Sequence, residues 1–431
     1  MDTERWRPSS EADIESMIKE DLLRETHFLD MKREVEHAPG ARKELARDLA
    51  QFALDGGSLL IGVSEDKPNR TWKLTPQPLE GFAERVEMIA HALTDPALFV
   101  TTHIIPSQQD STRGYLFVEV PPSPLAPHMV DGAYYARGDK ARIRLSDAEV
   151  LRHHAARSDM TQIADSLLDE EIARDPLTGA DGASNGHLYL IAQPLTAPKD
   201  IARGFVHDKP SEVYQLIMSV DEQMDHRLRQ YSPSLTHAST SVIRARGVAR
   251  CSHSLRNGRK FTPDLPSTDA DAESVRRAVN SAEARMLDIE LGEDGSVRVL
   301  VGRMTDTIES QSQEQPIDLI FDGLAVAYSI RLVHWTRTLG ERTGYFGSWT
   351  FGIAATNLDG LQSALSYNNF RGTWPHYDQP TFRETTFASH TEMRERPHDI
   401  VERIVGPLVR GLGSYEAFRD SLEHSHPDHQ D

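Results

Sequence analysis

Residues 42–64 have the sequence RKELARDLAQFALDGGSLLIGVS and change within one short stretch from a helical to a strand pattern. Apolar residues recur first at the spacing of one helix face, which predicts a helix over 42–54. Gly56 and Gly57 supply the left-handed conformation at which helices commonly end. The apolar run over 59–64 is typical of a buried strand. This stretch therefore predicts a helix followed directly by a strand of a sheet.

The segments on either side extend the mixture of helices and strands. A capping box at Ser10 predicts a helix over 11–22, and residues 25–34 alternate as a strand does. A second capping box, at Ser146, opens a helix after the strand expected over 141–145. Further helices are expected within residues 82–93, 213–220, 317–328 and 400–412, and further strands within 99–105, 115–120, 187–192, 286–301 and 345–355. The pattern predicts the α+β class.

A chain of 431 residues exceeds the size of an ordinary single core, so at least two domains are expected. The end of residues 158–186 is rich in Gly, Ser and Asp, which is typical of a linker. We therefore predict a first domain over 1–157, a helix and linker over 158–186, and a second α+β domain over 187–431. No motif in the second domain indicates its role.

Composition excludes several classes of protein. The net charge of −19 argues against a protein that coats nucleic acid through bulk charge, so nucleic-acid binding requires a local basic patch. A single cysteine, Cys251, excludes an intramolecular disulfide and a cysteine-cluster zinc site. The apolar runs are too short to cross a membrane, and the polar N-terminus is unlike a secretory signal. These features predict a cytoplasmic protein with no membrane partner.

Four short blocks carry polar residues in an informative order. They are ETHFLDMK (25–32), AQFALDGG (50–57), LIGVSED (60–66) and YARG (135–138). Their order and spacing resemble the AlbA-like domain of the Schlafen family, also called the divergent AAA domain. The resemblance covers about residues 10–155. It implies an N-terminal domain with a mixed sheet and flanking helices.

The resemblance also implies a carboxylate triad, since ribonuclease members of that family carry acids at the positions of Glu25, Asp30 and Glu65. Asp66 lies beside the last acid, and Lys32 matches a further position of the pattern. Clustered carboxylates repel one another unless a hard cation such as Mg²⁺ or Mn²⁺ neutralises them. Such a cation polarises phosphate and activates water, while Lys32 is placed to neutralise a phosphate. The alternative is that Glu25 and Asp30 are ordinary solvent-facing residues.

A basic segment follows the last block. It contains the candidate nucleic-acid contacts Arg137, Lys140, Arg142 and Arg144, of which the last three share one strand face. The alternative is that these charges protect a sheet edge from pairing. Binding of ATP through a P-loop is not predicted, because no Gly-x-x-x-x-Gly-Lys-Ser/Thr sequence occurs.

The resemblance thus implies a metal-dependent endoribonuclease that acts on structured RNA such as tRNA. A homodimer is expected, since one such domain offers little surface to grip a folded RNA and symmetric dimers are common. Two other functions remain open: a non-catalytic nucleic-acid-binding transcriptional regulator and a dimerising interaction scaffold. Only the nuclease requires Glu25, Asp30 and Glu65 to lie close together.

Overall fold

The computed structural model describes most of the chain and divides into two units. The described residues are 6–36, 38–66, 71–138, 141–177, 185–195, 197–224, 228, 235, 238–252, 271–308, 317–365 and 375–423. Unit 1 comprises residues 1–159 and unit 2 comprises residues 160–431. The long helix α4 (Asp147–Ala173) begins in unit 1 and ends in unit 2. Both units combine helices and strands, so the chain is of the α+β class.

Unit 1 contains a five-stranded mixed sheet with the order β1-β2-β7-β5, in which β6 also pairs with β7. Its strands are β1 (Leu29–Lys32), β2 (Gly57–Ile61), β5 (Gln77–Pro78), β6 (Thr101–Pro106) and β7 (Arg113–Val120). Strands β1 and β2 are parallel, and the other pairs are antiparallel. Every residue of β2 is buried, as expected for a central strand covered on both faces.

Helices cover both faces of this sheet. Leu59 and Ile61 of β2 join the core that contains α2 (Pro39–Ala50) and α3 (Phe82–Ala92). Leu60 points the other way, into a core shared with α1 (Glu11–Lys19). This alternation follows from the two-residue period of a strand. Helix α2 begins three residues before the predicted start, because Pro39 suits the first turn of a helix.

The strand predicted over 59–64 is divided at Gly62. This glycine has φ +107°, and a Cβ atom there would lie 2.8 Å from the Tyr115 ring. The chain therefore leaves the main sheet and continues as β3 (Val63–Asp66), which pairs with β4 (Thr71–Leu74) in a separate two-stranded sheet. The strand predicted over 25–34 is likewise shorter, since only β1 is regular.

Unit 2 contains a seven-stranded antiparallel sheet with the order β12-β13-β14-β15-β11-β18-β20. Its strands are β11 (Leu188–Pro194), β12 (Thr240–Arg244), β13 (Gly247–Cys251), β14 (Leu287–Gly292), β15 (Val297–Val301), β18 (Ser348–Thr356) and β20 (Thr381–Ser389). The predicted strand at 187–192 and hairpin at 286–301 are confirmed as β11 and as β14 with β15. Cys251 is buried at the end of β13.

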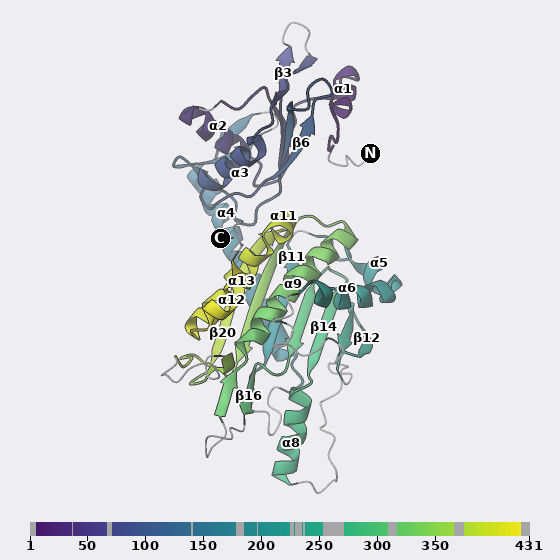
Figure 1. The fold of residues 1–431 in the computed structure, drawn as a ribbon, viewed down its shortest axis with the longest axis vertical. Coiled ribbons are helices and arrows are strands. Elements are labelled where there is room, and N and C mark those ends of the chain that lie inside the picture. Colours follow the sequence, from purple (N-terminus) through teal and green to yellow (C-terminus); the bar gives the residue numbers. More distant parts are fainter. Residues whose placement is uncertain are drawn as a thin grey trace. The chain divides into compact units, whose positions relative to one another are not determined.

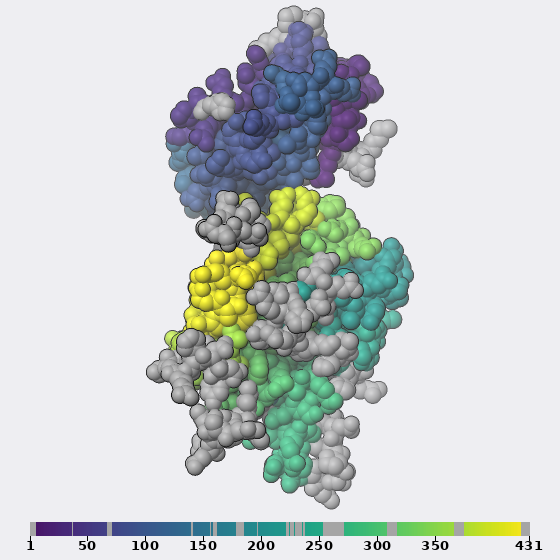
Figure 2. All heavy atoms as spheres, in the orientation of Figure 1, coloured from purple at the N-terminus to yellow at the C-terminus, as the bar shows by residue number. Residues whose placement is uncertain are grey.

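Most helices of unit 2 pack on one face of this sheet (Figure 1). They are α5 (Arg203–Asp208), α6 (Pro210–Gln223), α9 (Asp322–Thr343), α11 (His390–Glu395), α12 (Pro397–Gly411) and α13 (Tyr415–Leu422). Helices α12 and α13, yellow in Figure 2, form part of the outer surface of this unit. Leu190 of β11 joins this core, whereas Tyr189 and Ile191 face the opposite side with Leu168 of α4. The sheet is thus covered on both faces.

The helix predicted over 317–328 is wrong at its start. Residues 317–320 form β17 (Ile317–Ile320), which pairs with β16 (Thr305–Ile308), and α9 begins only at Asp322. Ile317 and Ile320 are three residues apart, a spacing that suits one face of a helix and also a short strand that is buried at one end. Pairing with β16 on one side and with β19 (Gln362–Ser363) on the other decides between them, and residues 317–320 alone do not contain that information.

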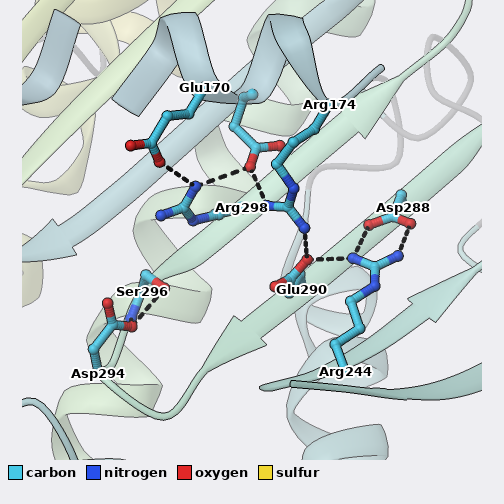
Figure 3. Close-up of polar contacts among 9 residues, drawn as sticks. Glu170, Arg174, Arg244, Asp288, Glu290, Asp294, Ser296 and Arg298 are labelled. Carbon is cyan, nitrogen blue, oxygen red and sulfur yellow. Dashed lines mark hydrogen bonds and ion pairs between the residues drawn. The ribbon is translucent and has the colours of Figure 1, made fainter. Parts of the chain in front are cut away.

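Buried ion pairs attach α4 to the sheet of unit 2 (Figure 3). Arg174 bridges Glu171 and Glu290, each at 2.6 Å, and Arg298 lies 3.1 Å from Glu171. Arg244 on the edge strand β12 pairs with Asp288 at 2.5 Å and with Glu290. Because basic and acidic groups alternate, each charge in this network lies against opposite charges.

Three further predictions concern membrane-spanning helices, the linker and the capping box at Ser146. Among the described helices, none combines the length and the apolar character needed to cross a membrane. The glycine-rich part of the predicted linker, residues 178–184, lies outside the described residues. The capping box at Ser146 is confirmed, because its hydroxyl accepts from the backbone of Glu149 while its own backbone donates to the Glu149 carboxylate.

Candidate functional site

Glu25 and Asp30 form the centre of the candidate site in unit 1. Glu25 is half-buried just before β1, and Asp30 lies within that strand. Burial raises the pKa of Glu25, and repulsion by Asp30 and by Glu65 raises it further, against the attraction of Arg137. A hydrogen bond between the carboxyl groups of Glu25 and Asp30 acts in the same direction. The two acids therefore favour a shared proton or another positive charge between them.

Glu65 and Asp66 point in different directions from β3. Glu65 is exposed and raises the pKa of Glu25 by its charge, so it belongs to the same electrostatic cluster. Asp66 is buried, and its Oδ2 lies 2.8 Å from Nζ of Lys73 on β4. Adjacent strand residues face opposite sides of a sheet, which explains why the two acids have different neighbours. Asp66, predicted as a metal ligand, is held by Lys73.

Arg137 lies behind the acids rather than on the surface. Its side chain is 3% exposed, and its Nη1 lies 3.2 Å from Oδ2 of Asp30. The same guanidinium donates to the carbonyl oxygens of Thr26 and Leu29 and stacks over the Phe52 ring. Arg137, expected to contact nucleic acid, instead fixes the backbone before β1 and the orientation of Asp30. Its five fixed donors suit this bridging role.

Three of the four sequence blocks meet around this arginine, and the fourth lies beside them through the pairing of β1 with β2. His27 lies between the others, with Nε2 3.1 Å from Oδ2 of Asp55 and Nδ1 3.2 Å from the carbonyl oxygen of Gly138. Phe28 accepts a backbone hydrogen bond from Ser58 of β2. Residues that are far apart in the sequence therefore form one continuous site, with the Glu25 segment at its centre. His27 belongs to the block ETHFLDMK, but the sequence pattern assigns it no role.

Lys32 belongs to a neighbouring network that the sequence did not predict. Its Nζ lies 2.6 Å from Asp48 on α2, and Arg142 on β10 (Arg142–Arg144) lies 2.8 Å from the same carboxylate. Arg142 also pairs with Glu44, at 2.8 Å. Burial raises the pKa of Asp48, although Lys32 and Arg142 oppose the shift. The sequence signal was present, since Glu44 and Asp48 are four residues apart on a predicted helix.

The remaining basic residues differ in environment. Arg144 is exposed, and within the described part of the chain no carboxylate lies within ion-pair distance of it. Arg142 and Arg144 lie on one face of β10 because they are two residues apart. Strand β10 lies at the edge of a three-stranded sheet, where it pairs with β9 (Ala133–Arg137) and with no other described strand. Lys140 lies outside the described residues. Arg144 is thus a basic residue available at this edge.

The donor set matches a hard cation in type. Carboxylate oxygens of Glu25, Asp30 and Glu65 are the ligands that Mg²⁺ and Mn²⁺ prefer, and their mutual repulsion would be relieved by such a charge. Across the residues that the structure describes, no three His, Cys, Asp or Glu side chains are grouped closely enough to hold a metal ion. Asp30 is instead neutralised in part by Arg137. The carboxylates therefore match such a cation in donor chemistry and in charge, whereas their spacing in the described structure does not form a metal-binding group.

Comparisons with known proteins place the chain in no family. No family model matches it, and no curated protein is significantly similar to it. A crystal structure of the DIP2311 protein from Corynebacterium diphtheriae is similar over 95% of this chain and 91% of that one. The sequence identity is 12% and the TM-score is 0.24. This score is too low to establish a shared fold.

Proposed function

We propose that the chain is a divalent-cation-dependent endoribonuclease that acts on structured RNA such as tRNA. The observation that carries the proposal is the electrostatic cluster of Glu25, Asp30 and Glu65, in which the pKa of Glu25 is raised by burial and by the other two acids. Mutual repulsion between acids destabilises the folded chain, and a bound cation would relieve that repulsion.

Each residue has a distinct role in this proposal. Glu25, Asp30 and Glu65 would hold Mg²⁺ or Mn²⁺, which when bound would polarise a phosphodiester and lower the pKa of water. Arg137 is a positioning residue, because it fixes Asp30 through two hydrogen-bonding nitrogens and does not reach the surface. Lys32, held 2.6 Å from Asp48, offers a positive charge to a phosphate oxygen.

The thermal stability of the protein tests the cation site without an activity assay. The pKa of Glu25 in the folded chain lies above its ordinary value of 4.5, so the unfolded chain releases the carboxyl proton at a lower pH than the folded chain does. Ionised Glu25 therefore reduces the free energy of unfolding once the pH exceeds 4.5. We therefore expect Glu25→Gln to raise the melting temperature of unit 1 at pH 7 in EDTA. This gain should disappear below pH 4.5.

In Mn²⁺ the wild type should instead have a higher melting temperature than Glu25→Gln. At ten times its dissociation constant, Mn²⁺ should stabilise the wild type by about 1.4 kcal/mol, a shift of about 3–6 °C, and Glu25→Gln by much less. Glu80→Gln, which changes an exposed acid of unit 1, is the matched control and should respond as the wild type does. Equal Mn²⁺ shifts in all three proteins would remove Glu25 from the proposed site.

Binding of RNA is assigned to the edge strand β10. Arg144→Glu should weaken RNA binding about 3- to 10-fold and reduce the slope of log affinity against log salt by about one, since one phosphate contact is lost. Lys19→Glu, an equal charge change at an exposed position on α1, should have little effect. Filter binding at several salt concentrations measures both values. An unchanged slope for Arg144→Glu would make β10 a protected edge and not an RNA contact.

A non-catalytic nucleic-acid-binding regulator is the second candidate. Arg137 already places a positive charge against Asp30, at 3.2 Å, and so neutralises part of the cluster without a cation. This candidate predicts the same effect of Arg144→Glu on RNA binding but no stabilisation by Mn²⁺. For either function we also propose a homodimer, because a single β10 edge offers few contacts to a folded RNA.

A further inference from the structure

Unit 2 contains a cavity between the helices that cover one face of its sheet. Its volume is about 220 Å³, and residues of α6, α9, α11 and α12 line it. The apolar part of the lining includes Val220, Ile330, Val333, Met393 and Val401. A cavity of about 150 Å³ accommodates benzene, so this one suits a ligand of roughly nine non-hydrogen atoms. The lining is mainly apolar with a few polar groups, as is usual for small-molecule sites.

The polar part of the lining is basic. It consists of His334, Arg337 and His398, and the described lining residues include no Asp or Glu. Ile330, Val333, His334 and Arg337 follow one another at helical spacing, so one face of α9 runs along the cavity. From Ile330 to Arg337 this face extends about 10 Å, at 1.5 Å per residue. The lining therefore changes from apolar to cationic over the length of a small amphipathic molecule.

Arg337 has donor capacity that its neighbours do not use. Among the described residues, its buried Nε has no hydrogen-bond acceptor, and its ion pair with Glu341 is long, at 3.8 Å. Its Nη2 lies 3.4 Å from Nδ1 of His334, a weak contact in which the imidazole accepts. A buried donor without an acceptor is costly, and a ligand carboxylate would satisfy it.

His334 favours an anion without adding fixed charge. Burial, and to a lesser extent the charge of Arg337, lowers the pKa of His334 to about 4, so its imidazole is neutral at pH 7. Since Nδ1 faces Arg337, the proton belongs on Nε2, which is then a donor. His398 is fixed by the contact of its Nδ1 with the Ser421 carbonyl oxygen, at 2.8 Å. Arg337 is thus the fixed positive charge among the described lining residues.

We propose that this cavity binds a small monocarboxylate with an apolar body, its carboxylate on Arg337 and its apolar part along Ile330, Val333 and Val401. A medium-chain fatty acid or an arylalkanoate has the required size and length. This site is independent of the proposed ribonuclease site, because every residue involved belongs to unit 2. In this proposal the second unit binds a small acidic metabolite.

Isothermal titration calorimetry with octanoate and 3-phenylpropanoate tests the proposal. We expect saturable binding of at least one acid at one site per chain, with 1-octanol binding at least tenfold more weakly. Arg337→Met keeps the apolar stem and removes the charge, and should weaken binding roughly tenfold or more. Arg342→Met is the matched control, since Arg342 lies on the same helix, is 56% exposed and does not line the cavity.

Two further measurements guard against misfolded variants. Val333→Phe should fill the cavity and abolish binding while the near-ultraviolet circular dichroism remains native. In the wild type, octanoate should shift the ring resonances of His334 and His398. Absence of saturable binding by both acids, equal binding of 1-octanol, or unchanged affinity in Arg337→Met would each overturn the assignment, whatever the result of the RNA cleavage assays.

Discussion

Asp30→Asn is expected to reduce cation-dependent cleavage of RNA at least about 100-fold, a typical loss when a ligand or an acid–base group of an active site is removed. Asn preserves the shape of the side chain and still offers an oxygen to Arg137, which lies 3.3 Å from Oδ1. The substitution therefore removes the negative charge while retaining the contact. Asp30→Ala is a poorer test, because it would take the carboxylate partner from a buried arginine.

The control and the readout separate catalysis from folding. Asp21→Asn changes an acid that precedes the same segment, pairs with Arg24 and has a positive φ that Asn also tolerates. It should cleave total tRNA at the wild-type rate with Mn²⁺. The Asp30→Asn protein should remain folded at the assay temperature, as circular dichroism would show, and should bind RNA normally. Retention of more than a tenth of the cleavage rate by Asp30→Asn would contradict the role of this carboxylate.

The sequence predicts that the acids lie close together but does not predict their immediate partners. The order of the four blocks implies that Glu25, Asp30 and Glu65 belong to one site. Both other acids raise the pKa of Glu25, although the described residues include no three acids grouped closely enough to hold a metal ion. The order of the blocks does not predict that the Arg137 side chain turns toward the core. A residue at the end of a strand faces the core or the solvent according to what lies behind it, and Phe52 and Thr26 are distant in sequence.

The same limit explains the roles of Lys32 and Arg142. The sequence predicts both residues as phosphate contacts, yet each side chain lies against Asp48. The sequence places Asp48 on a helix but assigns it no role. The contact depends on how α2 packs beside β1 and β10, and local periodicity carries no such information. Secondary structure was more predictable, since capping boxes and apolar spacing are local signals. The error at Ile317 arose where pairing with other strands, β16 and β19, decided the outcome.

Arg244→Ala is expected to destabilise unit 2 by about 3 kcal/mol or more, because the change takes the guanidinium partner from two carboxylates of β14. Asp288 is fully buried and Glu290 nearly so, with side-chain exposures of 0% and 12%. Arg244 is itself only 9% exposed, so water cannot replace it readily. Figure 3 shows both acids directed toward this arginine.

The effect should depend on pH in a defined direction. Although burial opposes it, the charges of Arg244 and Arg174 lower the pKa of Glu290 below 4.5. A lowered folded-state pKa gives stability that is present above pH 4.5 and is lost as the pH falls through the folded value. The difference in unfolding free energy between the wild type and Arg244→Ala should therefore be largest near neutral pH and should narrow in acid.

Chemical denaturation of the full chain, followed by circular dichroism, measures these differences. Arg277→Ala is the matched control: its side chain is 71% exposed, its pair with Glu273 is long at 3.9 Å, and the cost should stay below about 0.5 kcal/mol. Arg244→Met combined with Asp288→Leu should recover at least half of the lost stability, since the pair is replaced by apolar groups and Glu290 keeps Arg174. If Arg244→Ala cost no more than Arg277→Ala, the charges would be paired with water, and β12 would be held by its backbone ladder to β13 alone.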